Sequence, residues 1–357
     1  MGAHETTYWH VLDDGRVQCD VCPRACRLHE GQRGLCFVRA RENDAIVSTT
    51  YGRSSGYCID AIEKKPLNHF LPGTPVLSFG TAGCNLTCKF CQNWDISKSR
   101  DVDTLADAAS PQAIAEAAVR LGCTSVAFTY NDPVVFLEYA VDTALACRAQ
   151  GIRTVGVTAG YIEPGPRAEL FGAMDAINID LKGFTEEYYH KVCGGHLDRV
   201  LETIEWAVHE SPAWIELTTL VVPGHNDSDA ELTRMARWVI DHVGPDVPMH
   251  FSAFHPDWKM LDVPPTPPDA RAGAADRDGR RCALRLYGKR PRPGRGHHVL
   301  PVVPDAGHRA GLVRDPAVRP RPARCLPYLR NRDPGGVRGG RGDLGQTPVA
   351  GDFARIA

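Results

Sequence analysis

The chain has 357 residues, of which 43% are hydrophobic and 24% charged, and its formal net charge is −2. This length accommodates one α/β barrel of roughly 200–250 residues together with smaller appendages. No apolar run reaches the roughly 20 residues of a membrane-spanning helix, and the N-terminus lacks the charged-then-apolar order of a signal peptide. We therefore expect a cytoplasmic protein whose 13 cysteines are mostly reduced, so that clustered cysteines bind metal rather than form disulfides.

Charge divides the chain into two parts. The first 262 residues hold 22 Lys and Arg against 35 Asp and Glu, whereas the remainder holds 19 against 8. A change of this size marks a domain boundary. The predicted units are a cysteine-rich module (1–50), a polar connector (51–74), an α/β barrel (75–262) and an Arg/Pro/Gly-rich tail (263–357).

Strands and helices alternate along the predicted barrel. Apolar and β-branched runs predict six strands, at 75–81, 124–130, 152–158, 175–182, 214–222 and 247–254. The segments between them predict helices at 111–122, 134–151, 167–172, 185–192, 197–210 and 228–244. Ser110 and Ser228 are the expected N-caps of two of these helices. The alternation predicts α/β architecture, a partial (β/α)6-type barrel with its site at the C-terminal ends of the strands.

The tail has an unusual composition. It contains 18 Arg, 14 Pro and 14 Gly but no Glu, and it shows no helical or strand periodicity. One interpretation is a basic disordered arm that binds nucleic acid. The other is GC-rich coding sequence translated out of frame, which the lack of Lys, Ser and simple repeats favours. We expect a disordered tail whose native reading frame is lost between about residues 265 and 272.

Residues 84–95 read CNLTCKFCQNWD, in which Cys84, Cys88 and Cys91 form a C-x3-C-x2-C pattern. Three thiolates can bind three irons of a [4Fe–4S] cluster and leave the fourth iron open, as catalysis requires. The alternative is structural zinc completed by a distant Cys or His. The spacing fits zinc less well, because zinc sites usually contain C-x2-C pairs.

This pattern, with Phe90 before its last cysteine, resembles the signature of radical S-adenosylmethionine (SAM) enzymes. The run GCNLTCKFCQNWDIS is similar to the branch related to pyruvate formate-lyase activating enzymes. The segments AIEKKPLNHFLPG and CDVCPRACRLHEGQRGLC resemble the radical SAM member of the AmmeMemoRadiSam group. The resemblance covers about residues 17–268 and implies a [4Fe–4S] cluster whose open iron binds SAM. It also implies reductive cleavage of SAM to a 5′-deoxyadenosyl radical that abstracts hydrogen from a substrate.

The same resemblance implies contacts with SAM at three strand ends. Asn131 and Asp132 lie where the family holds the SAM amino group; the alternative is an Asx turn before the following proline. Asp180 and Lys182 match a family motif, so that Lys182 is expected at the SAM carboxylate; the alternative is a salt bridge at the barrel rim. His255 matches a family histidine near the SAM adenosine.

Four further cysteines follow a C-x2-C-x3-C-x9-C pattern in the N-terminal module. Four thiolates suit either zinc or a closed second iron–sulfur cluster, and the sequence leaves that choice open. The predicted ligands of this second metal site are Cys19, Cys22, Cys26 and Cys36.

These observations favour a radical SAM enzyme acting on an unidentified substrate. The resemblance implies an electron donor such as flavodoxin or ferredoxin, and a protein substrate or partner with Memo-like or AMMECR-like domains. A second hypothesis is a glycyl-radical enzyme activase. A third, non-enzymatic hypothesis is a zinc-binding scaffold with a nucleic-acid-binding tail; otherwise neither nucleic acid nor membrane is an expected partner.

Overall fold

The computed structural model describes residues 4–99 and 107–267, together with three short strands further along the chain. Its centre is a curved sheet in which six strands run parallel, each hydrogen-bonded to the one before it in the sequence. This arrangement confirms the predicted six-stranded partial barrel. The parallel strands are β9 (Pro75–Phe79), β11 (Ser125–Phe128), β12 (Arg153–Thr158), β13 (Ala176–Asp180), β14 (Trp214–Val221) and β15 (Met249–Ala253).

Two antiparallel strands extend the sheet beyond β9. The first, β8 (Tyr57–Ala61), pairs with β9, and the second, β18 (Arg324–Cys325), pairs with β8. The sequence analysis placed residues 57–61 in the connector, but here they form a strand. Their sequence, YCIDA, mixes apolar and charged side chains, and its one charged residue, Asp60, is buried and ion-paired with Lys65.

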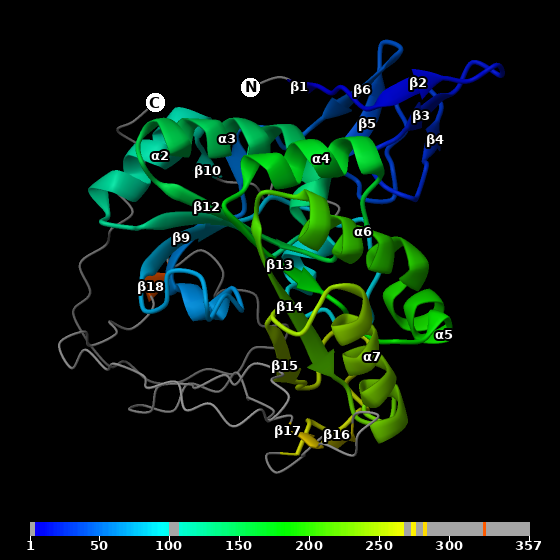
Figure 1. Ribbon diagram of the computed structural model, residues 1–357. Coiled ribbons are helices and arrows are strands. Elements are labelled where there is room, and N and C mark those ends of the chain that lie inside the picture. The colour runs from blue at the N-terminus through cyan, green and yellow to red at the C-terminus, as the bar shows by residue number, and fades with distance from the viewer. Residues whose placement is uncertain (1–3, 100–106, 268–272, 276–280, 284–323, 326–357) are drawn as a thin grey trace, which may run out of the picture.

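Helices cover the outer side of the sheet (Figure 1). Ser110 and Ser228 cap two of them as expected, because each hydroxyl accepts a backbone N–H three residues later. The helix predicted at 167–172 begins earlier, at Pro164, a residue type suited to the first helical turn. The covering helices are α2 (Pro111–Arg120), α3 (Leu137–Ala149), α4 (Pro164–Ala173), α6 (Leu197–Glu210) and α7 (Asp229–His242).

Shorter elements complete the described fold. The helix expected at 185–192 is divided into α5 (Glu186–Tyr188) and a π-helix, η4 (Tyr189–Cys193). Two pairs of short strands are antiparallel: β7 (Arg53–Ser54) with β10 (Asp107–Ala108), and β16 (Gly273–Ala275) with β17 (Arg281–Ala283). The remaining short helices are η1 (Ile62–Lys64), α1 (Trp94–Ser97) and η3 (Pro133–Phe136).

The N-terminal module consists of two small antiparallel sheets. One contains β1 (His4–Glu5), β6 (Ala45–Ser48) and β5 (Arg39–Glu42); the other contains β2 (Trp9–Val11), β3 (Val17–Cys19) and β4 (Arg27–Leu28). The buried side chains of the module belong to the same hydrophobic core as the barrel. A buried ion pair joins the two parts, with 2.6 Å between Arg39 Nη2 and Glu138 Oε2 on α3.

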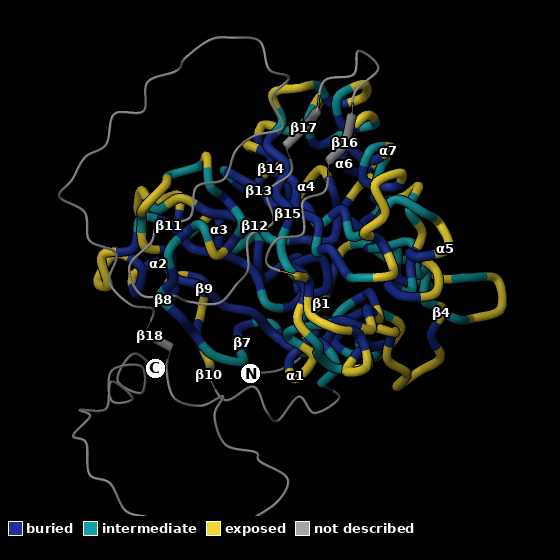
Figure 2. Tube along the Cα trace, turned by 90° about the horizontal axis from the view of Figure 1, so that it is seen from below, coloured by how far each residue is buried: buried dark blue, intermediate teal, exposed yellow. Residues whose placement is uncertain are grey.

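Part of the connector packs against the parallel strands of the half-barrel. Ile62 and Leu67 pack against the inward-facing row Val76, Ala127, Val155 and Ala176. The carboxylate of Glu216 on β14 accepts the backbone N–H groups of Asn68, His69 and Phe70. Figure 2 shows the resulting pattern, with buried strands inside and exposed residues at the outer helices and loops.

Most of the tail lies outside the described residues, so its expected disorder and loss of reading frame stay predictions. Of the helices in the part that the structure describes, none has the length and apolar character needed to cross a bilayer.

Candidate functional site

The three predicted cluster cysteines follow β9 at the C-terminal end of the sheet. We call residues 81–93 the three-cysteine loop. Asn131, just beyond β11, holds the start of this loop: its Oδ1 accepts Thr81 N–H at 3.0 Å, and its amide nitrogen lies 2.9 Å from Gly83 O and 3.1 Å from Ala82 O. The Asn131 side chain is therefore already bonded to the loop, and its predicted contact with SAM stays a prediction.

Asp132 is similarly engaged by the protein. Its Oδ1 accepts Val134 N–H at 3.1 Å, which is the Asx turn considered from the sequence, and Thr158 Oγ1 at 2.8 Å. Its Oδ2 accepts Ala159 N–H at 2.9 Å. Burial raises the pKa of Asp132 even though these hydrogen bonds oppose the shift. The residue joins the ends of β11 and β12, and its role toward SAM stays a prediction.

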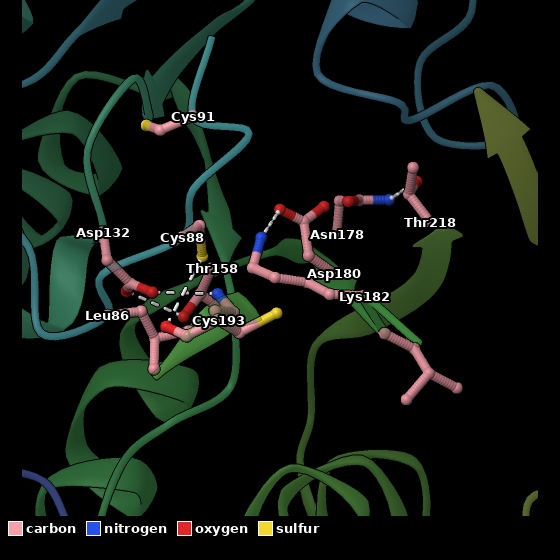
Figure 3. A network of polar contacts seen from close by, with 12 residues as sticks. Leu86, Cys88, Cys91, Asp132, Thr158, Asn178, Asp180, Lys182, Cys193 and Thr218 are labelled. Carbon is pink, nitrogen blue, oxygen red and sulfur yellow. Dashed lines mark hydrogen bonds and ion pairs between the residues drawn. The ribbon is translucent and has the colours of Figure 1, made fainter. Parts of the chain in front are cut away.

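Asp180 and Lys182 lie beside the loop at the end of β13, as Figure 3 shows. Lys182 Nζ is 2.9 Å from Asp180 Oδ2 and 5.9 Å from the centre of the Phe90 ring. Burial lowers the pKa of Lys182, but the nearby Asp180 and Cys88 outweigh it and raise the pKa well above its usual value. The rim salt bridge that the sequence analysis held as the alternative is thus present, and it faces the central cysteine of the loop. The predicted contact of Asp180 and Lys182 with SAM stays a prediction.

Cys193 is a residue that the sequence analysis left unassigned. It is buried beside Cys88, which lies 3.9 Å from the Cys193 carbonyl oxygen. The Cys193 thiol hydrogen bond and the ammonium groups of Lys182 and Lys98 lower the pKa of Cys88 to about 6. An isolated cysteine has no motif that could have revealed this contact.

The segment after η4 packs closely on the three-cysteine loop. Thr87 N–H donates to Cys193 O at 2.9 Å, and Lys89 N–H donates to Val192 O at 3.0 Å. A Cβ atom on Gly194, which has φ +70°, would lie 2.0 Å from Thr87 Oγ1. Gly194 therefore leaves room for the Thr87 side chain, at a backbone conformation that other residues rarely adopt. The paired glycines of the VCGG sequence were the one signal of this contact in the sequence.

The donor set of the loop fits a thiolate-bound cluster. Cys84 and Cys91 are partly exposed, whereas Cys88 is buried. Burial raises the pKa of Cys84 to about 12, and Cys91 Sγ lies 3.0 Å from Ser97 Oγ. Across residues 4–99 and 107–267 no three Cys, His, Asp or Glu side chains converge as for one metal ion. A cluster does not require that convergence, because each thiolate binds a separate iron.

The four N-terminal cysteines line one small cavity of about 20 Å³. Arg24, Arg39 and Asn85 also line it, so the cavity adjoins the three-cysteine loop. Burial raises the pKa of Cys19 to about 11 and also raises the pKa of Cys36. The structure thus places Cys19, Cys22, Cys26 and Cys36 around one cavity. Within residues 4–99 and 107–267, however, these side chains do not converge on a point where a single metal ion would sit, so their role as metal ligands stays a prediction.

The remaining predicted residue, His255, lies just beyond β15. Its side chain is 52% exposed, with Nδ1 3.9 Å from Asp257 Oδ2. Asn226, in the loop after β14, is fully buried and donates its amide to Lys182 O at 2.7 Å. It therefore fixes the backbone of Lys182, a role that the sequence analysis did not foresee.

Comparison with known proteins identifies the family. A family model described as the radical SAM superfamily matches residues 79–236, which include the three-cysteine loop. An uncharacterised protein of Methanocaldococcus jannaschii is 42% identical over 263 residues, or 74% of this chain and 78% of that protein. The chain belongs to the radical SAM superfamily. It is therefore an enzyme, and the family implies a [4Fe–4S] cluster and SAM as cofactors.

Other members of the superfamily are more distant. Pyruvate formate-lyase 1-activating enzyme of Escherichia coli is 25% identical over 176 residues, or 48% of this chain and 70% of the relative. A probable GTP 3′,8-cyclase of Methanosarcina acetivorans is 26% identical, over 42% of this chain and 46% of the relative. A solved radical SAM methyltransferase from Sphaerobacter thermophilus shows a TM-score of 0.41 and 12% identity, over 72% of this chain and 68% of that one. The closer resemblance to the AmmeMemoRadiSam group stays a prediction.

Proposed function

We propose that this radical SAM enzyme holds a [4Fe–4S] cluster on Cys84, Cys88 and Cys91, cleaves SAM reductively and removes hydrogen from its substrate. The observation that carries the proposal is the three-cysteine loop itself, held at the C-terminal end of β9 with Cys88 facing Lys182. When bound, the cluster and SAM supply the electron transfer and the radical chemistry.

The side chains around the loop have distinct proposed roles. The Lys182 ammonium attracts the SAM carboxylate, and Asp180 holds that ammonium in place. Asn131 and Asp132 position the loop and the end of β12, and they present the surface that the SAM amino group would meet. His255, which is exposed beyond β15, is available to the adenosine.

We further propose that Cys19, Cys22, Cys26 and Cys36 bind a second metal centre, either zinc or a closed iron–sulfur cluster. Support comes from the single cavity that all four line. Thiolate is a preferred ligand of both metals. Elemental analysis for zinc, iron and sulfide distinguishes the two when Cys84, Cys88 and Cys91 are all changed to Ala, because the other cluster then contributes no iron or sulfide.

The substrate we propose is a protein. This rests on the similarity to an activating enzyme and on the resemblance to AmmeMemoRadiSam enzymes, which suggests partners with Memo-like or AMMECR-like domains. The electron donor would be a small carrier such as flavodoxin or ferredoxin. The family assignment favours these enzymatic hypotheses over a zinc-binding scaffold.

Anaerobic reconstitution of the full chain with iron and sulfide tests the cluster. We expect the reduced protein to give an EPR signal of a [4Fe–4S] cluster that changes on addition of SAM. Cys84→Ala should abolish the SAM-dependent change, whereas Cys123→Ala, which removes a buried thiol outside the loop, should preserve it. A SAM-dependent signal that survives Cys84→Ala would contradict the assignment of this ligand.

A second candidate, glycyl-radical enzyme activase, is favoured by the 25% identity to the activating enzyme of Escherichia coli. Incubation of the reduced chain and SAM with a protein that carries a glycyl-radical loop would test it. Activation produces the doublet EPR signal of a glycyl radical on the partner. Formation of 5′-deoxyadenosine without that signal would support reductive cleavage of SAM by this chain but would exclude the glycyl-radical activase hypothesis.

A further inference from the structure

Arg24 connects the two groups of cysteines. It lies between Cys22 and Cys26, but its side chain leaves the N-terminal module. Its Nε donates to Asn85 O, next to Cys84, at 2.9 Å, and its Nη2 donates to Gly194 O. One guanidinium therefore binds both the three-cysteine loop and the segment that packs on that loop.

Asn85 receives this contact in a fixed position. Its side chain is 1% exposed and donates to Tyr161 O at 2.7 Å. The Arg24 guanidinium carbon lies 5.6 Å from the centre of the Tyr161 ring, within the range of a cation–π contact. Asn85 also lines the four-cysteine cavity.

A second contact lies on the other side of Cys84. Gly83 has φ +77°, and a Cβ there would lie 2.0 Å from the carbonyl oxygen of Cys36. Thus the residues before and after Cys84 both contact the N-terminal module, the first at Cys36 and the second at Arg24. The two contacts are independent of each other, since one involves Arg24 and the other the Cys36 backbone.

The position of Arg24 depends on the cysteines around it. Ala25, its neighbour, has φ +43° and donates its N–H to Cys22 O at 3.1 Å, while Cys19 N–H donates to Cys26 O at 2.9 Å. A metal that binds these thiolates would hold this tight turn, because metal-binding energy stabilises the fold of the ligand loop.

We propose that the four-cysteine centre sets the geometry of the three-cysteine loop, with Arg24 as the positioning residue that transmits it. This rests on the proposed function, in that the four thiolates bind a metal and the three-cysteine loop binds the cluster. The occupant of the module is a thiophilic centre, zinc or iron–sulfur. This metal centre holds Arg24 in position, and Arg24 in turn holds the backbone of Asn85, next to Cys84.

The test compares three single variants of the full chain. Arg24→Leu removes the hydrogen bonds, Arg24→Lys keeps one charged donor, and Arg27→Leu is the matched control. Arg27 belongs to the same module but is exposed and bonds only to Gln18 among the contacts described for it. A fourth protein, Cys22→Ser with Cys26→Ser, removes two ligands of the module.

Two readouts do not require turnover. Amide hydrogen exchange of residues 85–91 should become about tenfold faster in Arg24→Leu and in the double cysteine variant, because local opening becomes easier. The SAM concentration that half-converts the EPR signal should rise about tenfold in Arg24→Leu, as for loss of an outer-shell partner. Arg24→Lys should lie between, and Arg27→Leu should match the unmodified chain.

The outcomes separate the inference from the proposed function. Unchanged exchange in Arg24→Leu would overturn the coupling, whether or not a cluster forms. Absence of any SAM-dependent signal in the unmodified chain would instead overturn the proposed function, and exchange would still decide the coupling. Retention of zinc, or of iron with sulfide, after Cys84, Cys88 and Cys91 are all changed to Ala supports the module centre; a metal-free protein overturns it.

Discussion

The two cysteine groups lie side by side at one end of the half-barrel, but their surroundings differ. In the three-cysteine loop, Cys88 is beside the Cys193 thiol and two ammonium groups, which lower its pKa to about 6. In the N-terminal module, burial dominates and raises the pKa of Cys19 to about 11. Arg39, a buried cation of the module, is already paired with Glu138.

This difference indicates what each group is suited for. The loop lies among charged side chains at the barrel rim, where a charged ligand such as SAM gains from fixed countercharges. The module offers four thiols around one small cavity, with Arg24, Arg39 and Asn85 also lining it, and four thiols are the number that a centre fully ligated by protein requires. Under the proposed function, the same ligand atom, thiolate sulfur, would serve an open site in one region and a closed site in the other.

The largest expected effect concerns the attachment of the module. Arg39→Met leaves Glu138 buried without its partner, so we expect a loss of about 3–5 kcal/mol in unfolding free energy. Urea unfolding followed by tryptophan fluorescence measures it. The double variant Arg39→Met with Glu138→Leu should lose less than Arg39→Met alone, because no uncompensated charge remains.

This result also distinguishes an integral module from an appended one. A separate first transition for the module, with the barrel transition unmoved, would show that the two regions fold independently. A single shifted transition would show that they form one cooperative unit.

The next effect concerns the contact between the regions. Gly83→Ala adds a methyl group that would lie 2.0 Å from Cys36 O, at a backbone φ of +77°. We expect a loss of about 3 kcal/mol, from left-handed strain and the backbone clash together. Gly31→Ala is the control, since Gly31 has φ +74° but nothing within 4 Å, and it should lose only about 1 kcal/mol. Equal losses of unfolding free energy in the two variants would mean that the three-cysteine loop and the N-terminal module are not closely packed at Gly83.

The regular part of the fold could be predicted from the sequence because its signals are local. Buried parallel strands appear as short apolar runs, and all six predicted strands overlap those of the structure. The N-caps Ser110 and Ser228 could be predicted because each hydroxyl accepts the backbone N–H of a residue only three positions later. The cysteine groups could likewise be found, because their ligands are close in sequence.

The contacts between the regions could not be predicted in this way. Arg24 donates to Gly194 O, 170 residues away in the sequence. Cys193 contacts Cys88, which is 105 residues away. Such pairs depend on how the strands and helices pack, and no local pattern records them. Strand β8 was missed for a related reason, since its pairing with β9 rather than its composition makes it a strand.

The smallest expected effect sharpens the comparison of the thiols. Cys88 and Cys19 are almost equally buried, with exposed fractions of 6% and 7%, so their reactivities differ mainly through pKa. In metal-free protein at pH 7.5, Cys88 is mostly thiolate and Cys19 mostly thiol. We expect iodoacetamide to modify Cys88 roughly tenfold faster, since the lower nucleophilicity of a low-pKa thiolate offsets part of the gain.

Mass spectrometry of quenched samples measures both rates in one protein. Because the hydrogen bond from Cys193 is the largest cause of the low pKa, Cys193→Ala, which removes that donor, should slow the labelling of Cys88 at pH 7.5 and leave that of Cys19 unchanged. Raising the pH to about 9 should then restore much of the Cys88 rate. The substitution raises the pKa of Cys88 but does not block iodoacetamide from reaching the thiol, so a higher pH regenerates the reactive thiolate. Equal rates at Cys88 and Cys19 across this range would remove the electrostatic distinction between the two groups.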